Sequence, residues 1–161
     1  MSMPTLRTYS LFLVIILWGT LLGGIVYSHL VYFPVYLSAL PDSAVVVNGP
    51  YGLNDAIFWM TIHPLLILSI ILALILNWTL RARRKLILMS LIVYALVIIV
   101  TQLYFLPELI AFERSPSSSV TPAEWFVRGR RWQWFSWIRG GIMYGGIIPL
   151  LLAVTKGGAT D

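Results

Sequence analysis

Four long apolar runs alternate with short polar segments along the chain, and this pattern predicts membrane-spanning helices. The runs cover residues 11–37, 56–78, 86–107 and 132–154. A helix needs about 20 apolar residues to cross the hydrocarbon core of a bilayer, and each run reaches that length. We therefore expect an all-α fold, a four-helix transmembrane bundle that forms a single integral membrane domain over residues 1–161.

The composition strengthens this prediction and excludes several classes of protein. The chain is 59% hydrophobic and only 11% charged, whereas a soluble domain has about a quarter of its residues charged. It has no cysteine, so disulfides and thiolate metal sites are excluded. The sequence also has no glycine loop for a nucleotide. We expect a multi-pass protein of a bacterial inner membrane, with neither a cofactor nor a metal.

The basic residues predict the orientation in the membrane. Four crossings place the N-terminus, the second loop and the C-terminus on one side of the bilayer. The short Arg-Ala-Arg-Arg-Lys loop at residues 81–85 makes that side cytoplasmic by the positive-inside rule. We expect an N-in, C-in topology. Because the basic residues are divided between both faces, they form no single surface for nucleic acid.

The third loop contains a predicted amphipathic helix over residues 122–132. Thr121, Pro122 and Glu124 follow the pattern of an N-cap, a proline at the first position and a capping box. The helix is rich in tryptophan and arginine, which is typical of a segment at the membrane interface. We expect it to lie there as an anchor or, alternatively, as a lid over an opening.

Polar side chains within the apolar runs fall at one predicted depth. At about 1.5 Å rise per residue, His63 and Arg139 each lie roughly 10 Å below the outer membrane surface. His29 and Gln102 fall at similar depths, and Glu108 comes at the end of the third run. Ionisable groups in membrane helices usually face the protein interior or a wet cavity. We therefore expect an outer polar pocket for a hydrophobic small molecule.

Residue types in this layer suggest roles for each member. A histidine is suited to act as a general base, and an arginine to stabilise the anion that results. The candidate catalytic residues are His29, His63, Glu108 and Arg139. The candidate ligand-binding residues are Gln102, Tyr104, Ser136, Trp137 and Trp59. Alternatives are a metal held by the two histidines and Glu108, a site that only binds lipid, a quinone-like molecule or a partner, and a structural polar network.

Glycines on the first and fourth runs allow close helix packing. Gly19 and Gly23 lie four residues apart on the first run, and the fourth run contains Gly140, Gly141, Gly145 and Gly146. This spacing lets helices approach closely. We expect these faces to bring the first and fourth helices together. The alternative is that they bind a second copy or another membrane protein, in which case the chain is a non-enzymatic small subunit or assembly factor of a larger complex.

The chain resembles the anthrone-oxygenase-like family of small four-helix membrane proteins, the DUF1772 group. The resemblance rests on Gly-Gly before His29 and Pro34, on Tyr-Phe-Leu-Pro-Glu ending at Glu108, and on Trp132 with Ser136 and Arg139. It implies a compact bundle and cofactor-independent oxidation of anthrone-type polyketides. It assigns site roles to His29, Glu108 and Arg139. The family pattern has Asn where Ser136 stands, so this chain lacks an amide that could orient a substrate.

Overall fold

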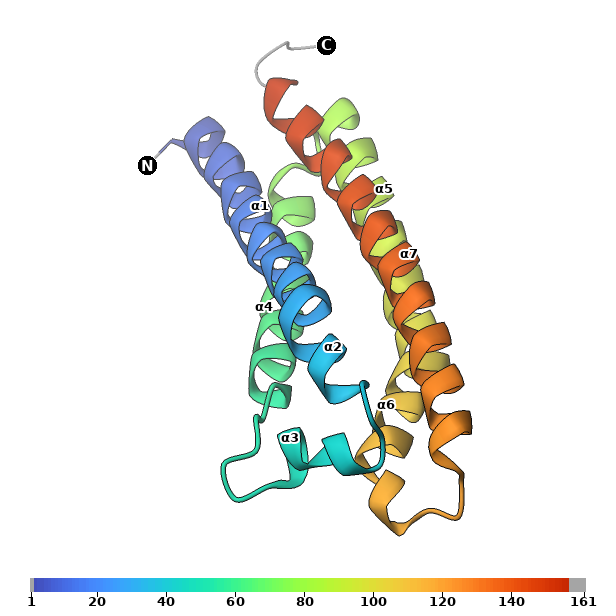
Figure 1. The fold of residues 1–161 in the computed structure, drawn as a ribbon. Helices are drawn as coiled ribbons and strands as arrows, with labels where there is room; N and C mark the ends of the chain where they lie inside the picture. The colour runs from blue at the N-terminus through green and yellow to red at the C-terminus, as the bar shows by residue number, and fades with distance from the viewer. Residues whose placement is uncertain (1, 157–161) are drawn as a thin grey trace.

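The computed structural model describes residues 2–156, and their fold is a bundle of four long helical spans (Figure 1). Each span is long and apolar enough to cross a membrane. Three of them exceed the predicted apolar runs because polar turns extend the helices beyond the hydrocarbon. The observed spans are Met3–Tyr36, Ala56–Leu76, Arg81–Glu113 and Pro122–Thr155.

The first and third spans each consist of two α-helices joined by a wider π-helical turn. In the first span, α1 (Met3–Tyr27) and α2 (Phe33–Tyr36) flank the turn Ser28–Tyr32. In the third, α5 (Arg81–Val100) and α6 (Leu106–Glu113) flank the turn Thr101–Phe105.

The second and fourth spans are single helices, α4 (Ala56–Leu76) and α7 (Pro122–Thr155). The loop before α4 contains a 3₁₀ turn, Asp42–Ala44, and the short helix α3 (Val45–Asn48). A second 3₁₀ turn, Ser115–Ser117, lies between α6 and α7.

The helices form a closed ring in which α1 packs on α4 and α7, and α5 packs on the same two helices. Helix α1 begins and α7 ends at one end of the bundle, which we call the basic end (Figure 1). Helices α2, α3 and α6 lie at the opposite end, which we call the loop end. The expected contact between the first and fourth helices is confirmed.

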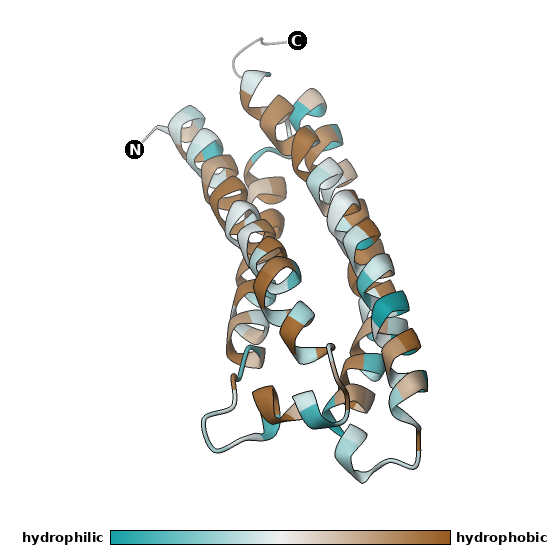
Figure 2. Cartoon of the chain, in the orientation of Figure 1, coloured by the Kyte–Doolittle hydropathy of each residue, from teal (hydrophilic) through white to brown (hydrophobic). Residues whose placement is uncertain are grey.

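Large apolar side chains are exposed along all four spans. Hydrophobic residues dominate the helices, while hydrophilic residues gather at the two ends and along the part of α7 nearest α6 (Figure 2). In water such a surface would be unstable, whereas hydrocarbon solvates it. The exposed residues include Ile16, Leu68, Leu96 and Ile148. These features fit a multi-pass membrane protein.

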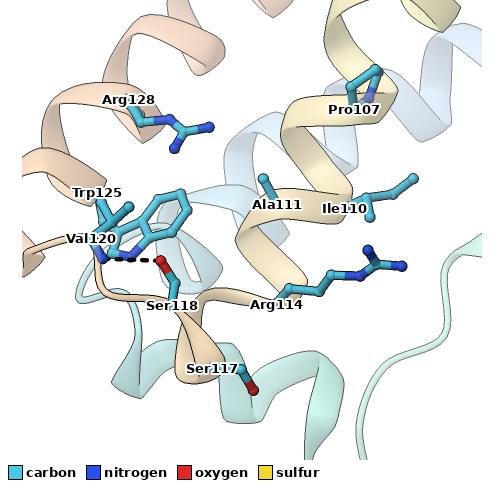
Figure 3. Close-up of a pocket in the computed structure, with 9 residues that line it drawn as sticks. All are labelled: Pro107, Ile110, Ala111, Arg114, Ser117, Ser118, Val120, Trp125 and Arg128. Carbon is cyan, nitrogen blue, oxygen red and sulfur yellow. Dashed lines mark hydrogen bonds between the residues drawn. The ribbon is translucent and has the colours of Figure 1, made fainter.

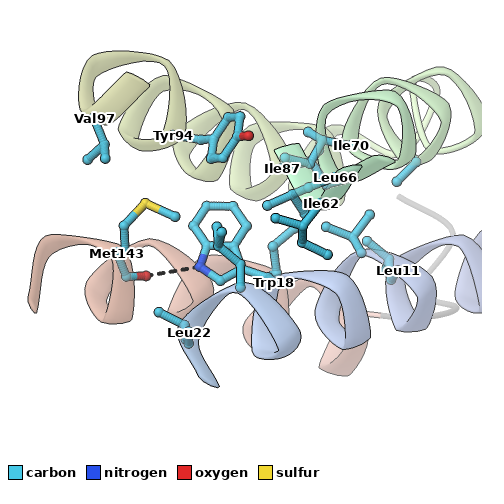
Figure 4. Close-up of a cluster of buried hydrophobic side chains, with 14 of the residues drawn as sticks. Leu11, Trp18, Leu22, Ile62, Leu66, Ile70, Ile87, Tyr94, Val97 and Met143 are labelled. Atoms are coloured by element: carbon cyan, nitrogen blue, oxygen red, sulfur yellow. Dashed lines mark hydrogen bonds between the residues drawn. The ribbon is translucent and has the colours of Figure 1, made fainter. Parts of the chain in front are cut away.

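Two clusters of buried side chains hold the bundle together. The central core is mostly aliphatic and surrounds Trp18, whose indole donates a 3.0 Å hydrogen bond to the carbonyl of Met143 (Figure 4). The aromatic core lies at the loop end around Trp132, whose indole donates to the carbonyl of Phe105 at 3.0 Å. It consists of Tyr32, Phe33, Tyr36, Leu37, Leu40, Ala44, Phe105, Phe112, Trp125 and Trp132.

Each π-helical turn ends shortly before a proline. Pro34 and Pro107 follow the two turns by two residues. Proline has no N–H to donate and its ring clashes with the carbonyl four residues earlier, and a π turn widens the helix at that point. The first span therefore continues through Pro34 to Tyr36.

The predicted capping box at the third loop is confirmed, but the helix it opens is not separate. The backbone N–H of Glu124 donates to Thr121 Oγ1 at 3.3 Å, and the N–H of Thr121 donates to the Glu124 carboxylate at 3.0 Å. Residues 122–132 then form the first turns of α7, which continues without a break to Thr155. Their position at the membrane interface stays a prediction.

Only some of the expected glycines make close helix contacts. A Cβ added at Gly146 would lie 2.7 Å from Trp18, and one added at Gly24 would lie 2.4 Å from Phe58. In contrast, nothing lies within 4 Å of a Cβ added at Gly19, Gly23, Gly141 or Gly145. The interpretation of these four as internal packing residues is wrong, because they lie on the outside of α1 and α7.

Candidate functional site

Arg139 is the central polar group of the loop-end half of the bundle. Its guanidinium donates to Ser136 Oγ at 2.8 Å and to Thr101 Oγ1 at 3.1 Å. It also lies over the ring of Phe105, with Cζ 4.1 Å from the ring centroid. Within residues 2–156 the only carboxylate salt bridge joins two other residues. Arg139 is therefore a half-buried cation held by neutral groups.

His29 is buried in the first π-helical turn of the same half of the bundle. Its Nδ1 lies 2.7 Å from the carbonyl oxygen of Ile25, which can only accept, so Nδ1 carries the proton. In the neutral ring, Nε2 then holds a lone pair, and this atom is buried without a hydrogen-bond partner. Trp137 and Phe33 pack on the ring, with centroids 4.8 and 5.4 Å away.

His63 lies on α4 in a second aromatic setting. Its Nδ1 is 2.8 Å from the hydroxyl of Tyr94, which also lies 3.3 Å from the His63 carbonyl. Trp59 stacks on the imidazole at 6.0 Å between centroids. The indole of Trp59 in turn donates to the carboxylate of Asp55 at 2.9 Å. Contacts from α4 and α5 thus fix the position of this histidine.

Ring contacts link His29 and Arg139, because His29 packs on Trp132, Trp132 packs on Phe105, and Arg139 lies over Phe105. His63 contacts Tyr94 instead, which packs on Trp18 of the central core. Ser136 joins His29 and Arg139 as a direct partner of Arg139, and Trp137 joins them through its contact with His29.

Glu108 pairs with Arg128 rather than with Arg139. Both carboxylate oxygens of Glu108 accept from Arg128, at 2.9 and 3.2 Å. Because Arg128 lies nearer the start of α7 than Arg139 does, this pair belongs to the rim at the loop end.

Two of the predicted ligand-binding residues lie on the second π-helical turn with different exposures. Gln102 is exposed on the outside of the bundle. Tyr104 is half-buried against Phe105 and Phe135, and its hydroxyl is buried without a partner. Thr101, on the same turn, is a partner of Arg139 that the sequence reasoning missed. Its position three residues before Tyr104 and six residues before Pro107 was the available signal.

Two open hollows lie near this region. One of about 470 Å³ on the surface of α7 is lined by Arg130, Gln133, Trp134 and Trp137. Through Trp137 it adjoins His29. The second, of about 620 Å³, lies between α6 and the start of α7 and includes Arg114, Trp125 and Arg128 (Figure 3).

No set of metal ligands is assembled in the part of the chain that the structure describes. No three histidine, cysteine, aspartate or glutamate side chains there come close enough to hold a metal. The alternative in which His29, His63 and Glu108 form a two-histidine, one-carboxylate centre therefore has no geometric support.

Comparisons of this chain with protein-family models, curated proteins and solved structures gave no match. The assignment of a function to the site therefore depends on its geometry and chemistry.

Proposed function

We propose that this protein binds a hydrophobic small molecule with one acidic C–H or O–H group in the loop-end half of the bundle, and removes the proton. The observation that carries the proposal is the pairing of two incomplete groups. Arg139 is a cation without a carboxylate partner, and His29 has a buried lone pair on Nε2 without a donor. An acidic ligand would supply both missing partners.

The proposed chemistry is a single proton transfer. The acidic C–H or O–H bond of the ligand breaks, and its proton moves to Nε2 of His29. The electron pair stays on the ligand as an anion, which Arg139 stabilises through charge-assisted hydrogen bonds. Ser136 and Thr101 orient the guanidinium toward this anion.

Aromatic side chains suit the apolar part of such a ligand. Trp137 packs on His29 and also lines the 470 Å³ hollow on α7, so this one side chain separates a flat ring system bound there from the imidazole. Apolar pockets with a few convergent polar groups are typical of small-molecule sites. The resemblance to anthrone oxygenases suggests an anthrone-type ligand, whose carbanion would then reduce dioxygen, the co-reactant, without a cofactor.

Binding of anthrone to the purified full chain tests this proposal. Arg139→Gln should weaken binding about tenfold or more, since a tenfold change corresponds to about 1.4 kcal/mol and charge-assisted hydrogen bonds reach that strength. The matched control is Arg131→Gln, which removes the same charge from an exposed position on the same helix. His29→Gln should retain binding and lose proton abstraction. Equal affinity in the two arginine variants would refute the site.

A second candidate is a non-enzymatic subunit or assembly factor. The observation that favours it is the set of exposed glycines with open space above them, Gly19 and Gly23 on α1 and Gly141 and Gly145 on α7. A partner helix could approach both faces closely. Native mass spectrometry would show a partner or second copy in fixed stoichiometry, and Gly141→Leu would release it.

A further inference from the structure

We propose that the basic end of the bundle holds a binding site for the phosphate group of an anionic phospholipid, built from Arg7 and Arg83 around Asn77. The site lies at the opposite end from Arg139 and is independent of the function proposed above. It brings together the start of α1, the turn after α4 and the first turn of α5.

Asn77 is the fixed centre of this arrangement. It is fully buried, and its side-chain N–H groups point toward the carbonyls of Ala73 and Arg7 and the hydroxyl of Ser10, at 2.9, 3.3 and 3.4 Å. Its Oδ1 accepts from Nη1 of Arg83 at 3.2 Å. The amide therefore orients the Arg83 guanidinium while leaving its charge without compensation.

Arg83 has an incomplete set of partners for a buried cation. Its side chain is only 4% exposed, on the same face of α5 as the core residues Ile87 and Ser90. Its Nε is buried without a hydrogen-bond acceptor. A buried charged donor without an acceptor is costly, and an anion at this position would remove that cost.

Arg7 adds a second positive charge at short range. Its Nε donates to the carbonyl of Leu76 and its Nη2 to the hydroxyl of Thr79, both at 2.9 Å. Both arginines contact Asn77, whose amide donates to the backbone carbonyl of Arg7 and accepts from the Arg83 guanidinium. The acidic residues of the described chain all lie in the loop-end half: Asp42, Asp55, Glu108, Glu113 and Glu124. Two neighbouring guanidiniums with no carboxylate partner among residues 2–156 are suited to a phosphate, which accepts from both.

The depth of the site selects a lipid as the source of that phosphate. Trp78 is 53% exposed directly after the apolar helix α4, and Arg84 lies 5.1 Å above its ring. Exposed tryptophan and arginine at the end of a span mark the headgroup layer. Phospholipid phosphates occupy that layer, and clustered basic residues beside a span attract anionic lipids.

The test uses the full chain in phosphatidylcholine nanodiscs with and without phosphatidylglycerol. Phosphatidylglycerol should raise the melting temperature of the wild-type protein, because a ligand that binds the folded state stabilises it. Arg83→Gln should lose that rise and should retain phosphatidylglycerol about tenfold less well in native mass spectrometry. The control Arg81→Gln removes an equal charge from an exposed position of the same turn and should behave as wild type.

The remaining outcomes each decide the proposal. Equal losses in Arg81→Gln and Arg83→Gln would mean diffuse charge attraction and would overturn the site. An equal rise with inorganic phosphate in phosphatidylcholine nanodiscs would overturn the assignment to a lipid. If Arg83→Gln does not fold, Arg7→Gln provides the same comparison with the Arg81 control, and an unchanged response to phosphatidylglycerol in that variant would contradict the proposal.

Discussion

The central core and the loop-end half differ in how many of their buried polar groups have hydrogen-bond partners. In the central core, the side chains of Trp18 and Ser69 donate hydrogen bonds to backbone carbonyls. The hydroxyl of Ser90 is buried there without a hydrogen-bond partner. In the loop-end half, five buried polar groups lack one: His29, Tyr36, Tyr104, Ser115 and Trp125. Since native proteins satisfy most buried polar atoms, this concentration supports the proposal that the loop-end half binds a ligand, whereas the central core serves packing.

The largest expected effect on stability comes from replacing Trp18 and Trp132, the tryptophans at the centres of the two cores, with alanine. Trp18→Ala and Trp132→Ala should each lower the free energy of unfolding by about 3–5 kcal/mol, as large cavities do, measured by denaturant titration in micelles. They should differ in anthrone binding. Trp132 stacks on His29 with centroids 6.5 Å apart, so its loss should weaken binding, whereas Trp18→Ala should bind normally at a temperature where it is folded. Equal anthrone affinity in the two variants would contradict the assignment of ligand binding to the loop-end half alone.

A smaller effect should separate two neighbouring glycines of α7. A Cβ at Gly146 would lie 2.7 Å from Trp18 and 2.9 Å from Val93, so Gly146→Ala should cost about 1–3 kcal/mol through overpacking. Gly145→Ala meets nothing within 4 Å and should change stability by no more than about 0.5 kcal/mol. The same denaturant titration measures both. A stable Gly146→Ala variant would show that the central core is less tightly packed than described.

The helices could be predicted from the sequence, because about 20 consecutive apolar residues leave few alternatives in a membrane. The rotation of each helix about its own axis could not be predicted. Gly19 and Gly146 are the same residue type within apolar runs, yet Gly19 faces outward and Gly146 contacts Trp18. Overall hydrophobicity hides which face of such a helix is buried, since lipid and core are equally apolar.

The sequence predicts the candidate site as a layer, whereas its contacts come only from the structure. Depth counting places His29, His63 and Arg139 at one level, since rise per residue is nearly constant in helices. It also places Gln102 in the layer, although Gln102 is exposed. The partner of Glu108 could not be predicted, because opposite charge alone does not distinguish Arg128 from Arg139. The π-helical turns depend on how the chain relaxes around Pro34 and Pro107.

The melting temperature of Arg139→Met in the absence of ligand tests the central claim most directly. If the function of Arg139 is to bind a ligand, its half-buried charge lowers the stability of the unliganded protein. Replacing it with an apolar side chain of similar length should then leave the stability unchanged or raise it. We therefore expect Arg139→Met to melt at or above the wild-type temperature. A fall of several degrees would mean that Arg139, Ser136 and Thr101 form a structural network that holds α5 and α7 together, and would contradict the account of a ligand site.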